Sequence, residues 1–417
     1  MENVLLVTVE MDSDKSVLKP EEQAAEFNLL ARSVGAKVGA EIICRRHIPT
    51  PNYYIGKGKI QEIKELCQEN SINTVMFNND LSATQQRNTE EILGVKTIDR
   101  TQLILDIFAR HARTPEGKTQ VELAQLEYLL PRLSGKGILL SRMGGGIGTR
   151  GPGEQKLEVD RRRIKERISR LKQDLKALIE RRGTTRKKRK EIFLPSVTFV
   201  GYTSSGKSTL LNALVGSSQP VSKYLFTTLD PLSRTIALSN NQKILLSDTV
   251  GFINNLPPHL IEAFKATLEE ITESDILVHI LDASDLKLDQ HNKIVLGILK
   301  ELKIENKPII TALNKIDLLE DRGWLQKYKV DFPDSVGISA LKKENLSKLL
   351  ELIQNKLKRM VTLLDLEIPI KRMDLVNLIY KDGQVLEINY GQELVKIKAS
   401  LPIVTAYQLK LYNKNYC

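Results

Sequence analysis

Hydrophobic positions in the first hundred residues alternate between two spacings. Short apolar runs such as NVLLVTVE (3–10) and NTVMFN (73–78) are typical of buried strands, whereas EEQAAEFNLLARSVGA (21–36) and KIQEIKELCQEN (59–70) have the spacing of amphipathic helices. Strands that alternate with helices form parallel sheets with helices on their faces. The pattern therefore predicts a four-stranded parallel sheet in an N-terminal α/β subdomain over residues 1–112.

Two longer helical patterns follow, with a glycine-rich segment between them. The first has leucines at positions 123, 126, 130 and 133, and the second repeats Ile164, Ile168, Leu171, Leu175 and Leu178. Each apolar stripe is too narrow for a helix that stands alone, so we expect an antiparallel hairpin over residues 113–192. The second helix should span about 156–182, roughly 40 Å at 1.5 Å per residue. RRGTTRKKRKE (181–191) then reads as a basic linker.

Strand and helix spacings return over residues 193–360 and predict a central α/β domain. The remainder, 361–417, contains LLDLEIPI, a helical MDLVNLIYKDG, QVLEINY and ELVKIKAS, which predict a small α+β domain without a chemical motif. The expected fold class is therefore α/β, with a helical hairpin inserted between two α/β units and a small α+β unit at the end.

The charge of the chain is concentrated in the predicted hairpin. Between Arg132 and Glu191 there are 20 basic and 7 acidic residues, whereas the whole chain has a formal net charge of +11. Such a field favours a polyanion such as nucleic acid, although a solvated helix face explains it equally well. Three scattered cysteines and the lack of a long apolar run argue against a disulfide framework, a zinc site and a membrane span. We expect a monomeric, cytosolic protein.

A strong phosphate-binding motif opens the central domain. GYTSSGKST (201–209) follows the apolar VTFV and precedes the helical TLLNALVG, so it matches G-x-x-x-x-G-K-[ST] in the context that the motif requires. Gly201 and Gly206 let the backbone wrap the phosphates, whose oxygens the loop amides approach. Lys207 is expected to bridge the β- and γ-phosphates, and Ser208 to coordinate Mg²⁺.

Further motifs in the expected order define the rest of a GTP site. Asp248 of DTVG would hold Mg²⁺, and the Gly251 amide can approach the γ-phosphate. Thr228 of FTTLD (226–230) would give the metal a second hydroxyl. Asp317 of NKID can accept hydrogen bonds from guanine N1–H and the 2-amino group, which adenine cannot donate, and this selects GTP over ATP. The ISA segment (338–340) would close over the base.

These motifs give a complete set of expected site residues. Catalytic roles are expected of Lys207, Thr228 and Gly251, and metal coordination of Ser208, Thr228 and Asp248. The expected nucleotide contacts are Gly201, Tyr202, Thr203, Ser204, Ser205, Gly206, Lys207, Ser208, Thr209, Phe226, Thr227, Thr228, Leu229, Asp230, Asp248, Thr249, Val250, Gly251, Asn314, Lys315, Ile316, Asp317, Ile338, Ser339 and Ala340.

Phe252 stands where many GTPases have a water-orienting glutamine. A phenyl ring cannot orient water by hydrogen bonding, so intrinsic hydrolysis should be slow. Another group or a partner would then complete the site. Phe252 itself is either a packing residue or a gate, and the sequence does not distinguish these roles.

Several long segments resemble the HflX family of translation-factor-related GTPases. They include YIGKGK, LSATQQRN, IDRTQLILDIFARHA, QVELAQLEYLLPRL, GGGIGTRGPGE, FTTLDP, DTVGFINNLPPHLIEAFKATLEE and NKID. The resemblance implies a Mg²⁺-dependent P-loop GTPase that cycles between GTP and GDP, binds the large ribosomal subunit and its RNA, and can separate stalled ribosomes. It also implies Ser208 and Thr228 as Mg²⁺ ligands and a hydrophobic residue after DxxG.

The resemblance also gives a role to the glycine-rich segment RMGGGIGTRGPGEQK (142–156) at the hairpin tip. Its small residues permit close approach to folded RNA, and Arg142, Arg150 and Lys156 would neutralise phosphates. The alternative is an RNA chaperone or ribosome assembly factor for which GTP is a timing ligand with little turnover. Large subunits that leave hydrolysis unchanged, together with remodelling of free RNA, would favour that alternative.

Overall fold

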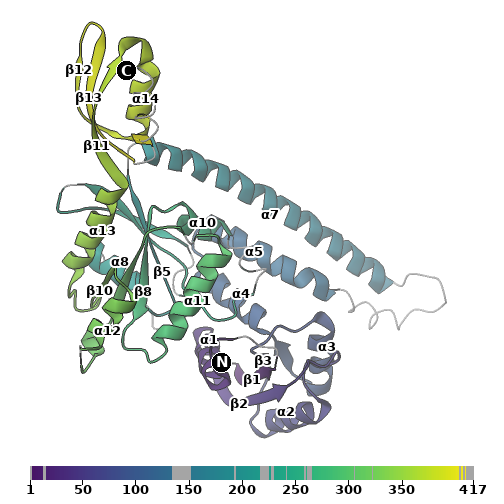
Figure 1. Cartoon of the computed structure of the whole chain (residues 1–417). Helices are drawn as coiled ribbons and strands as arrows, with labels where there is room; N and C mark the ends of the chain where they lie inside the picture. Colours follow the sequence, from purple (N-terminus) through teal and green to yellow (C-terminus); the bar gives the residue numbers. More distant parts are fainter. Residues whose placement is uncertain are drawn as a thin grey trace.

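The computed structural model describes residues 2–12, 16–133, 152–191, 194–216, 225–226, 230–240, 242–257, 260, 265–304, 306–321, 323–402, 405–406 and 409. An N-terminal α/β subdomain and a central α/β domain lie side by side, and a small C-terminal unit lies at the far end of the central domain (Figure 1). The long helix α7 (Pro152–Glu191) is the second helix of the hairpin, and its C-terminal end lies beside the C-terminal unit. The predicted fold class is confirmed.

The N-terminal subdomain is built on a four-stranded sheet of order β2-β1-β3-β4, in which all neighbouring strands are parallel. The predicted parallel sheet is therefore correct. Asp99 and Ser82 accept hydrogen bonds from backbone amides in the first turns of two of its helices and so fix where those helices begin. The elements are β1 (Asn3–Met11), α1 (Pro20–Ser33), β2 (Lys37–Arg46), α2 (Lys57–Glu69), β3 (Thr74–Phe77), α3 (Ala83–Leu93), β4 (Lys96–Ile98) and α4 (Arg100–His111).

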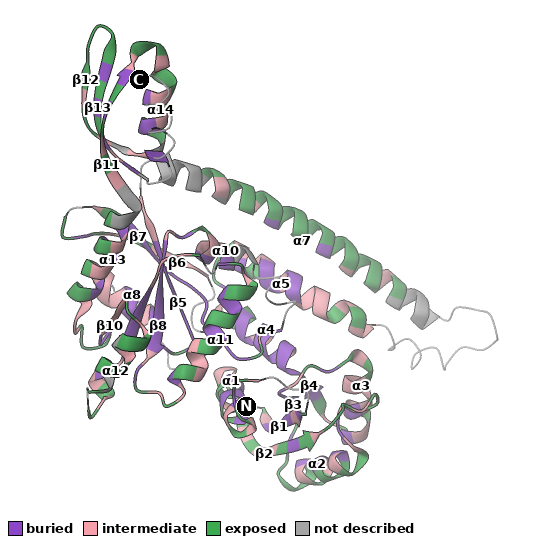
Figure 2. Ribbon diagram, in the orientation of Figure 1, coloured by how far each residue is buried: buried purple, intermediate pink, exposed green. Residues whose placement is uncertain are grey.

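The helical hairpin, called the arm below, consists of α5 (Pro115–Leu129), the short η1 (Leu130–Leu133) and α7. Leu123 of α5 packs with Ile168, Leu171 and Leu175 of α7, so the predicted seam is confirmed. Outside that seam most of α7 is exposed (Figure 2). Residues 134–151, which include Arg142 and Arg150 of the glycine-rich segment, lie outside the described residues.

The prediction of a basic linker after Arg181 is wrong. Helix α7 begins at Pro152 and continues to Glu191, about 60 Å at 1.5 Å per residue. Lysine and arginine are good helix formers, and cations near a helix C-terminus interact favourably with its dipole, so the basic run continues the helix through Gly183. Proline is well suited to the start of α7, because an amide hydrogen at the first helical position would have no partner within the helix.

The central domain contains a six-stranded sheet of order β10-β9-β8-β5-β7-β6, in which only β6 is antiparallel to its neighbour. Loops after β5, β7 and β9 therefore meet at one edge of the sheet, where open α/β sheets bind ligands. The elements are β5 (Ser196–Gly201), α8 (Lys207–Val215), β6 (Leu232–Ala237), β7 (Lys243–Asp248), α10 (Lys265–Glu273), β8 (Ile276–Asp282), α11 (Leu288–Glu301), β9 (Ile309–Asn314), η2 (Ile316–Leu318), α12 (Trp324–Asp331), β10 (Ser335–Gly337) and α13 (Leu346–Met360).

The C-terminal unit is a three-stranded antiparallel sheet of order β11-β13-β12 with a helix on one face. Val395, Ile397 and Ala399 of β13 pack under Val376 and Ile379 of the helix. Within the described residues, no helix is long and apolar enough to cross a membrane. The elements are β11 (Val361–Pro369), η3 (Ile370–Arg372), α14 (Met373–Asp382), β12 (Gln384–Tyr390) and β13 (Leu394–Pro402).

One hydrophobic core joins the N-terminal subdomain to the central domain. Its residues come from both sides of the boundary and are at most 9% exposed. Because the two units share this core, they should move as one body at their contact. The members include Leu103, Ile104, Ile107 and Phe108 from α4, Val121 and Ala124 from α5, and Leu225, Phe226, Val250, Ile253 and Leu260 from the central domain.

Candidate nucleotide-binding site

The phosphate-loop motif lies between the buried strand β5 and helix α8. At its last bend Gly206 has φ +98°, a left-handed conformation that glycine adopts without strain. A Cβ at this position would collide with the side-chain amide of Asn314. The loop can therefore close against NKID only with glycine here, and the N-terminus of α8 then faces the site.

Lys207 points into the loop and is almost fully buried. Its ammonium donates hydrogen bonds to the carbonyl oxygens of Gly201 (3.0 Å) and Tyr202 (2.7 Å). Burial lowers the pKa of Lys207 to about 8, and the carboxylate of Asp248 partly opposes this shift. A buried cation held by neutral carbonyl groups is poorly compensated, so a bound polyphosphate would stabilise it.

Ser208 and Asp248 meet beside the phosphate loop. The hydroxyl of Ser208 donates to the Asp248 carboxylate over 2.6 Å, which joins the start of α8 to the end of β7. A hydroxyl and a carboxylate are the hard oxygen donors that Mg²⁺ accepts, so these residues fit the ion. Thr228, the third expected ligand, lies outside the described residues together with Thr227 and Leu229.

The segment after Asp248 is paired with the phosphate loop. Thr203 N–H donates to the carbonyl oxygen of Phe252 (2.8 Å), and Phe252 N–H donates to that of Gly201 (3.1 Å). Gly251 lies against Thr203 and close to the ammonium of Lys207. The Phe252 ring is 2% exposed among apolar side chains, an environment that suits a packing residue.

The NKID and ISA segments are held together by Asn314. Its side-chain amide donates to the carbonyl oxygen of Ser205 (2.8 Å), and its side-chain oxygen accepts from Ala340 N–H (3.0 Å). One residue thus connects the phosphate loop to the ISA segment. Asp317 lies in η2 and is half-buried.

Asp282 supports NKID from the neighbouring strand β8, although no sequence motif marks it. Its carboxylate is 2.5 Å from the ammonium of Lys315, which has a left-handed backbone conformation at φ +65°. The ion pair restrains the side chain of Lys315 within NKID. An acidic residue at the end of the apolar strand ILVHILD (276–282) is the signal that could have identified it.

Tyr202 belongs to the phosphate-loop motif, but its side chain enters the boundary with the N-terminal subdomain. Its hydroxyl donates to Glu26 of α1 and accepts from Asn254 N–H (3.0 Å). The ring stacks on His291 of α11 with centroids 3.9 Å apart. Burial, followed by the Glu26 carboxylate, raises the pKa of Tyr202 above its usual range, so the hydroxyl keeps its proton.

Glu26 and Arg100 extend this contact to the segment after DTVG. Arg100 is 2.8 Å from the Glu26 carboxylate and donates to the carbonyl oxygen of Asn254 (2.7 Å). Both charged side chains are at most 9% exposed. No sequence motif marks this pair, because Glu26 and Arg100 are isolated charges on two amphipathic helices. Only tertiary packing brings them next to the segment after DTVG.

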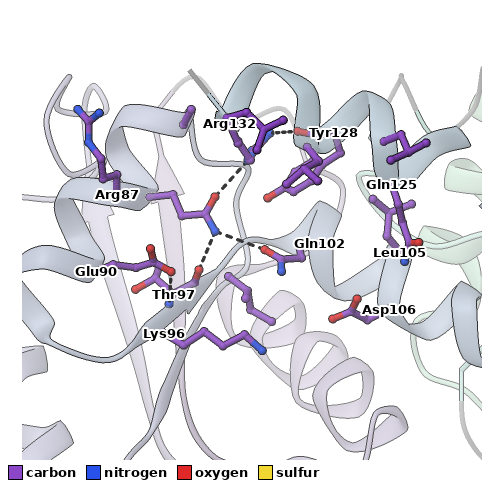
Figure 3. Close-up of a pocket in the computed structure, with 16 residues that line it drawn as sticks. Arg87, Glu90, Lys96, Thr97, Gln102, Leu105, Asp106, Gln125, Tyr128 and Arg132 are labelled. Atoms are coloured by element: carbon purple, nitrogen blue, oxygen red, sulfur yellow. Dashed lines mark hydrogen bonds between the residues drawn. The ribbon is translucent and has the colours of Figure 1, made fainter. Parts of the chain in front are cut away.

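A cavity of about 500 Å³ lies away from the phosphate loop, beside the edge strand β4 (Figure 3). There the Gln86 amide donates to the carbonyl oxygen of Thr97 (2.8 Å) and to Gln102 (3.3 Å), while Arg132 donates to Gln86 (3.1 Å). These side chains satisfy polar groups at the edge of β4, which protects the strand from pairing with another chain.

The geometry and the comparisons together define the class of protein. A phosphate loop, an Asp248–Ser208 contact and an NKID segment at one edge of this sheet define a P-loop GTPase. Residues 21–109 match the model described as "GTP-binding GTPase N-terminal", 111–189 match "GTP-binding GTPase Middle Region", and 196–315 match "50S ribosome-binding GTPase".

Curated relatives identify the family within that class. The chain is 43% identical to GTPase HflX of Caldanaerobacter subterraneus over 91% of this chain and 88% of that protein, and 37% identical to GTPase HflX of Escherichia coli over 97% and 94%. A solved GTP-binding protein of Sulfolobus solfataricus in complex with GDP is 28% identical over 85% of this chain and 98% of that one, with a TM-score of 0.45. The chain belongs to the HflX family of GTPases, and it is a GTP-hydrolysing enzyme.

Proposed function

We propose that this GTPase binds the large ribosomal subunit through its arm, hydrolyses GTP with Mg²⁺, and separates stalled ribosomes under the control of the bound nucleotide. Mg²⁺ would be held by Ser208, Asp248 and Thr228 and would neutralise charge on the phosphates during transfer. Asp317 would select guanine.

The length, exposure and basic charge of the arm support the proposal that it binds the ribosome. Helix α7 is about 60 Å long and packs on α5 along a single apolar seam. Arg161, Arg162 and Arg163 on it are exposed. A long, exposed and basic helix pair that projects from a GTPase domain can bind RNA, because its cations release counterions from the phosphates.

The test is the triple variant Arg142→Gln, Arg150→Gln and Lys156→Gln at the predicted tip. Binding to purified large subunits should weaken, and its dependence on salt concentration should become less steep, because fewer counterions are released. Hydrolysis without subunits should hardly change. Unchanged binding and salt dependence would contradict the proposal.

Lys207→Ala serves as the matched control at the nucleotide site. It should abolish most hydrolysis, because it removes positive charge from the transition state, while the arm remains intact. If wild-type protein instead remodels free RNA and large subunits leave its hydrolysis unchanged, the protein acts as an RNA chaperone or assembly factor.

A further inference from the structure

The start of α5 is fastened to the central domain by Asp230. The Asp230 carboxylate accepts hydrogen bonds from the backbone amides of Arg113 and Thr114, both at 2.8 Å, and from the Thr114 hydroxyl at 2.5 Å. All three donors lie at the N-terminus of α5, where the helix dipole favours a negative charge. The first helix of the arm is therefore attached to the last residue of FTTLD.

The contact between Asp230 and the start of α5 is called the joint below. The Thr114 hydroxyl takes part in it from both sides, because it bonds to Asp230 and to the first turn of α5. It donates to Asp230, and it accepts from the backbone amide of Gly117, which caps α5. Gly117 is in the first turn of α5 and makes room for the carboxylate. A Cβ added at Gly117 would lie closer to the Asp230 carboxylate than Cβ atoms in real proteins lie to any neighbouring atom.

A second contact anchors the other end of the same motif. The Phe226 ring packs edge-on against Phe108 of α4, with centroids 4.9 Å apart and planes at 78°. Leu225 N–H donates to the hydroxyl of Ser33 over 3.3 Å. Residues at both ends of FTTLD are thus held by the N-terminal subdomain and the arm, and Thr228 lies between them in the sequence.

We propose that Asp230 is a positioning residue that couples the arm to the nucleotide site, so that displacement of the arm by RNA changes the rate of GTP hydrolysis. The part of this inference that concerns RNA rests on the proposed function. The coupling itself does not, because Asp230 joins FTTLD directly to the start of α5, so replacing the bound nucleotide should also alter the start of α5.

Gly117→Ala tests the joint between Asp230 and α5 without substituting any residue of the phosphate loop, DTVG or NKID. Alanine is the better helix former, so α5 should persist, while its methyl group displaces Asp230. Gly58→Ala is the matched control, because Gly58 is also in a first helical turn, that of α2, and a Cβ there meets nothing within 4 Å. Thermal unfolding should confirm that both variants fold.

The first measurement is hydrogen exchange of the peptide that covers residues 113–117, without ribosomes. In the wild type and in Gly58→Ala, replacing GDP with a non-hydrolysable GTP analogue should change the exchange rate about fivefold or more. In Gly117→Ala exchange should be faster and the same with both nucleotides. Equal exchange with both nucleotides in the wild type would overturn the proposal, whatever ribosomal subunits do.

The second measurement is hydrolysis with purified large subunits. Gly117→Ala should still pellet with subunits and keep the basal rate, but lose stimulation by about fivefold or more. Thr114→Val should also lose stimulation, whereas Thr114→Ser, which keeps the hydroxyl, should retain it. Full stimulation in Gly117→Ala would overturn the coupling. If wild-type protein does not bind subunits, the proposed function fails, and hydrogen exchange still decides the coupling.

Discussion

Lys207 should make nucleotide binding depend on pH, with GTP affinity falling as the pH rises. With its pKa lowered to about 8, it loses its proton in the empty site as pH rises through 8, and a neutral amine cannot pair with phosphates. Between pH 7 and 8.5 the protonated fraction falls roughly fourfold, so GTP affinity should fall by the same factor. Titration with a fluorescent GTP analogue measures this. An affinity that does not vary over this range would contradict the assigned environment of Lys207.

Asp317 should determine the choice of base. In Asp317→Asn an amide donates where the carboxylate accepted, so GTP affinity should fall by roughly 100-fold or more, while xanthosine triphosphate, whose 2-keto group accepts, should gain affinity. Asp321→Asn, an exposed carboxylate four residues later, is the control and should bind GTP normally. Wild-type GTP affinity in Asp317→Asn would exclude this residue from the base site.

The hydroxyl of Tyr202 should make its own contribution to stability, separate from that of the ring. Tyr202→Phe keeps the ring on His291 but leaves Glu26 and Asn254 N–H without this partner in a buried place, so the free energy of unfolding should fall by about 1–3 kcal/mol. Tyr380→Phe, at a residue that is 49% exposed, should change it little. Denaturant titrations of both variants make the comparison, and equal losses would argue against the buried contact.

At the scale of elements, the seam between α5 and α7 should hold the arm together. Leu171 is 2% exposed in that seam, and truncation to alanine should destabilise the arm by about 2–4 kcal/mol. Hydrogen exchange within α5 and α7 reports this local stability. Arg162→Ala, on the exposed side of α7, should stay within about 0.5 kcal/mol. Equal protection in both variants would mean that the seam does not hold the arm.

Most elements could be predicted because each has its own local signal. Apolar spacing separates the strands of the N-terminal and central sheets from the amphipathic helices, and it also locates the seam of Ile168, Leu171 and Leu175. The predicted end of α7 is wrong, because a run of basic residues does not by itself indicate a linker. Lysine and arginine continue a helix readily, so charge alone does not end one.

At the scale of the whole molecule, sequence motifs located the phosphate loop, DTVG and NKID because chemistry fixes their residue types and spacing. The surroundings of the site could not be predicted in the same way. Glu26, Arg100 and Gly117 act through contacts with residues more than 100 positions away, and such contacts leave no periodic pattern. Through these contacts the N-terminal subdomain and the arm pack against the segments that flank the phosphate loop.

Under the proposed function, the bound nucleotide controls ribosome separation by a GTPase whose arm is attached to FTTLD at Asp230. The most direct measurement is sedimentation of intact ribosomes after incubation with the protein and either a non-hydrolysable GTP analogue or GDP. We expect the analogue to shift ribosomes to free subunits and the protein to sediment with the large subunit, whereas GDP should leave ribosomes intact. Intact ribosomes with both nucleotides, and protein that stays at the top of the gradient, would contradict the proposed function.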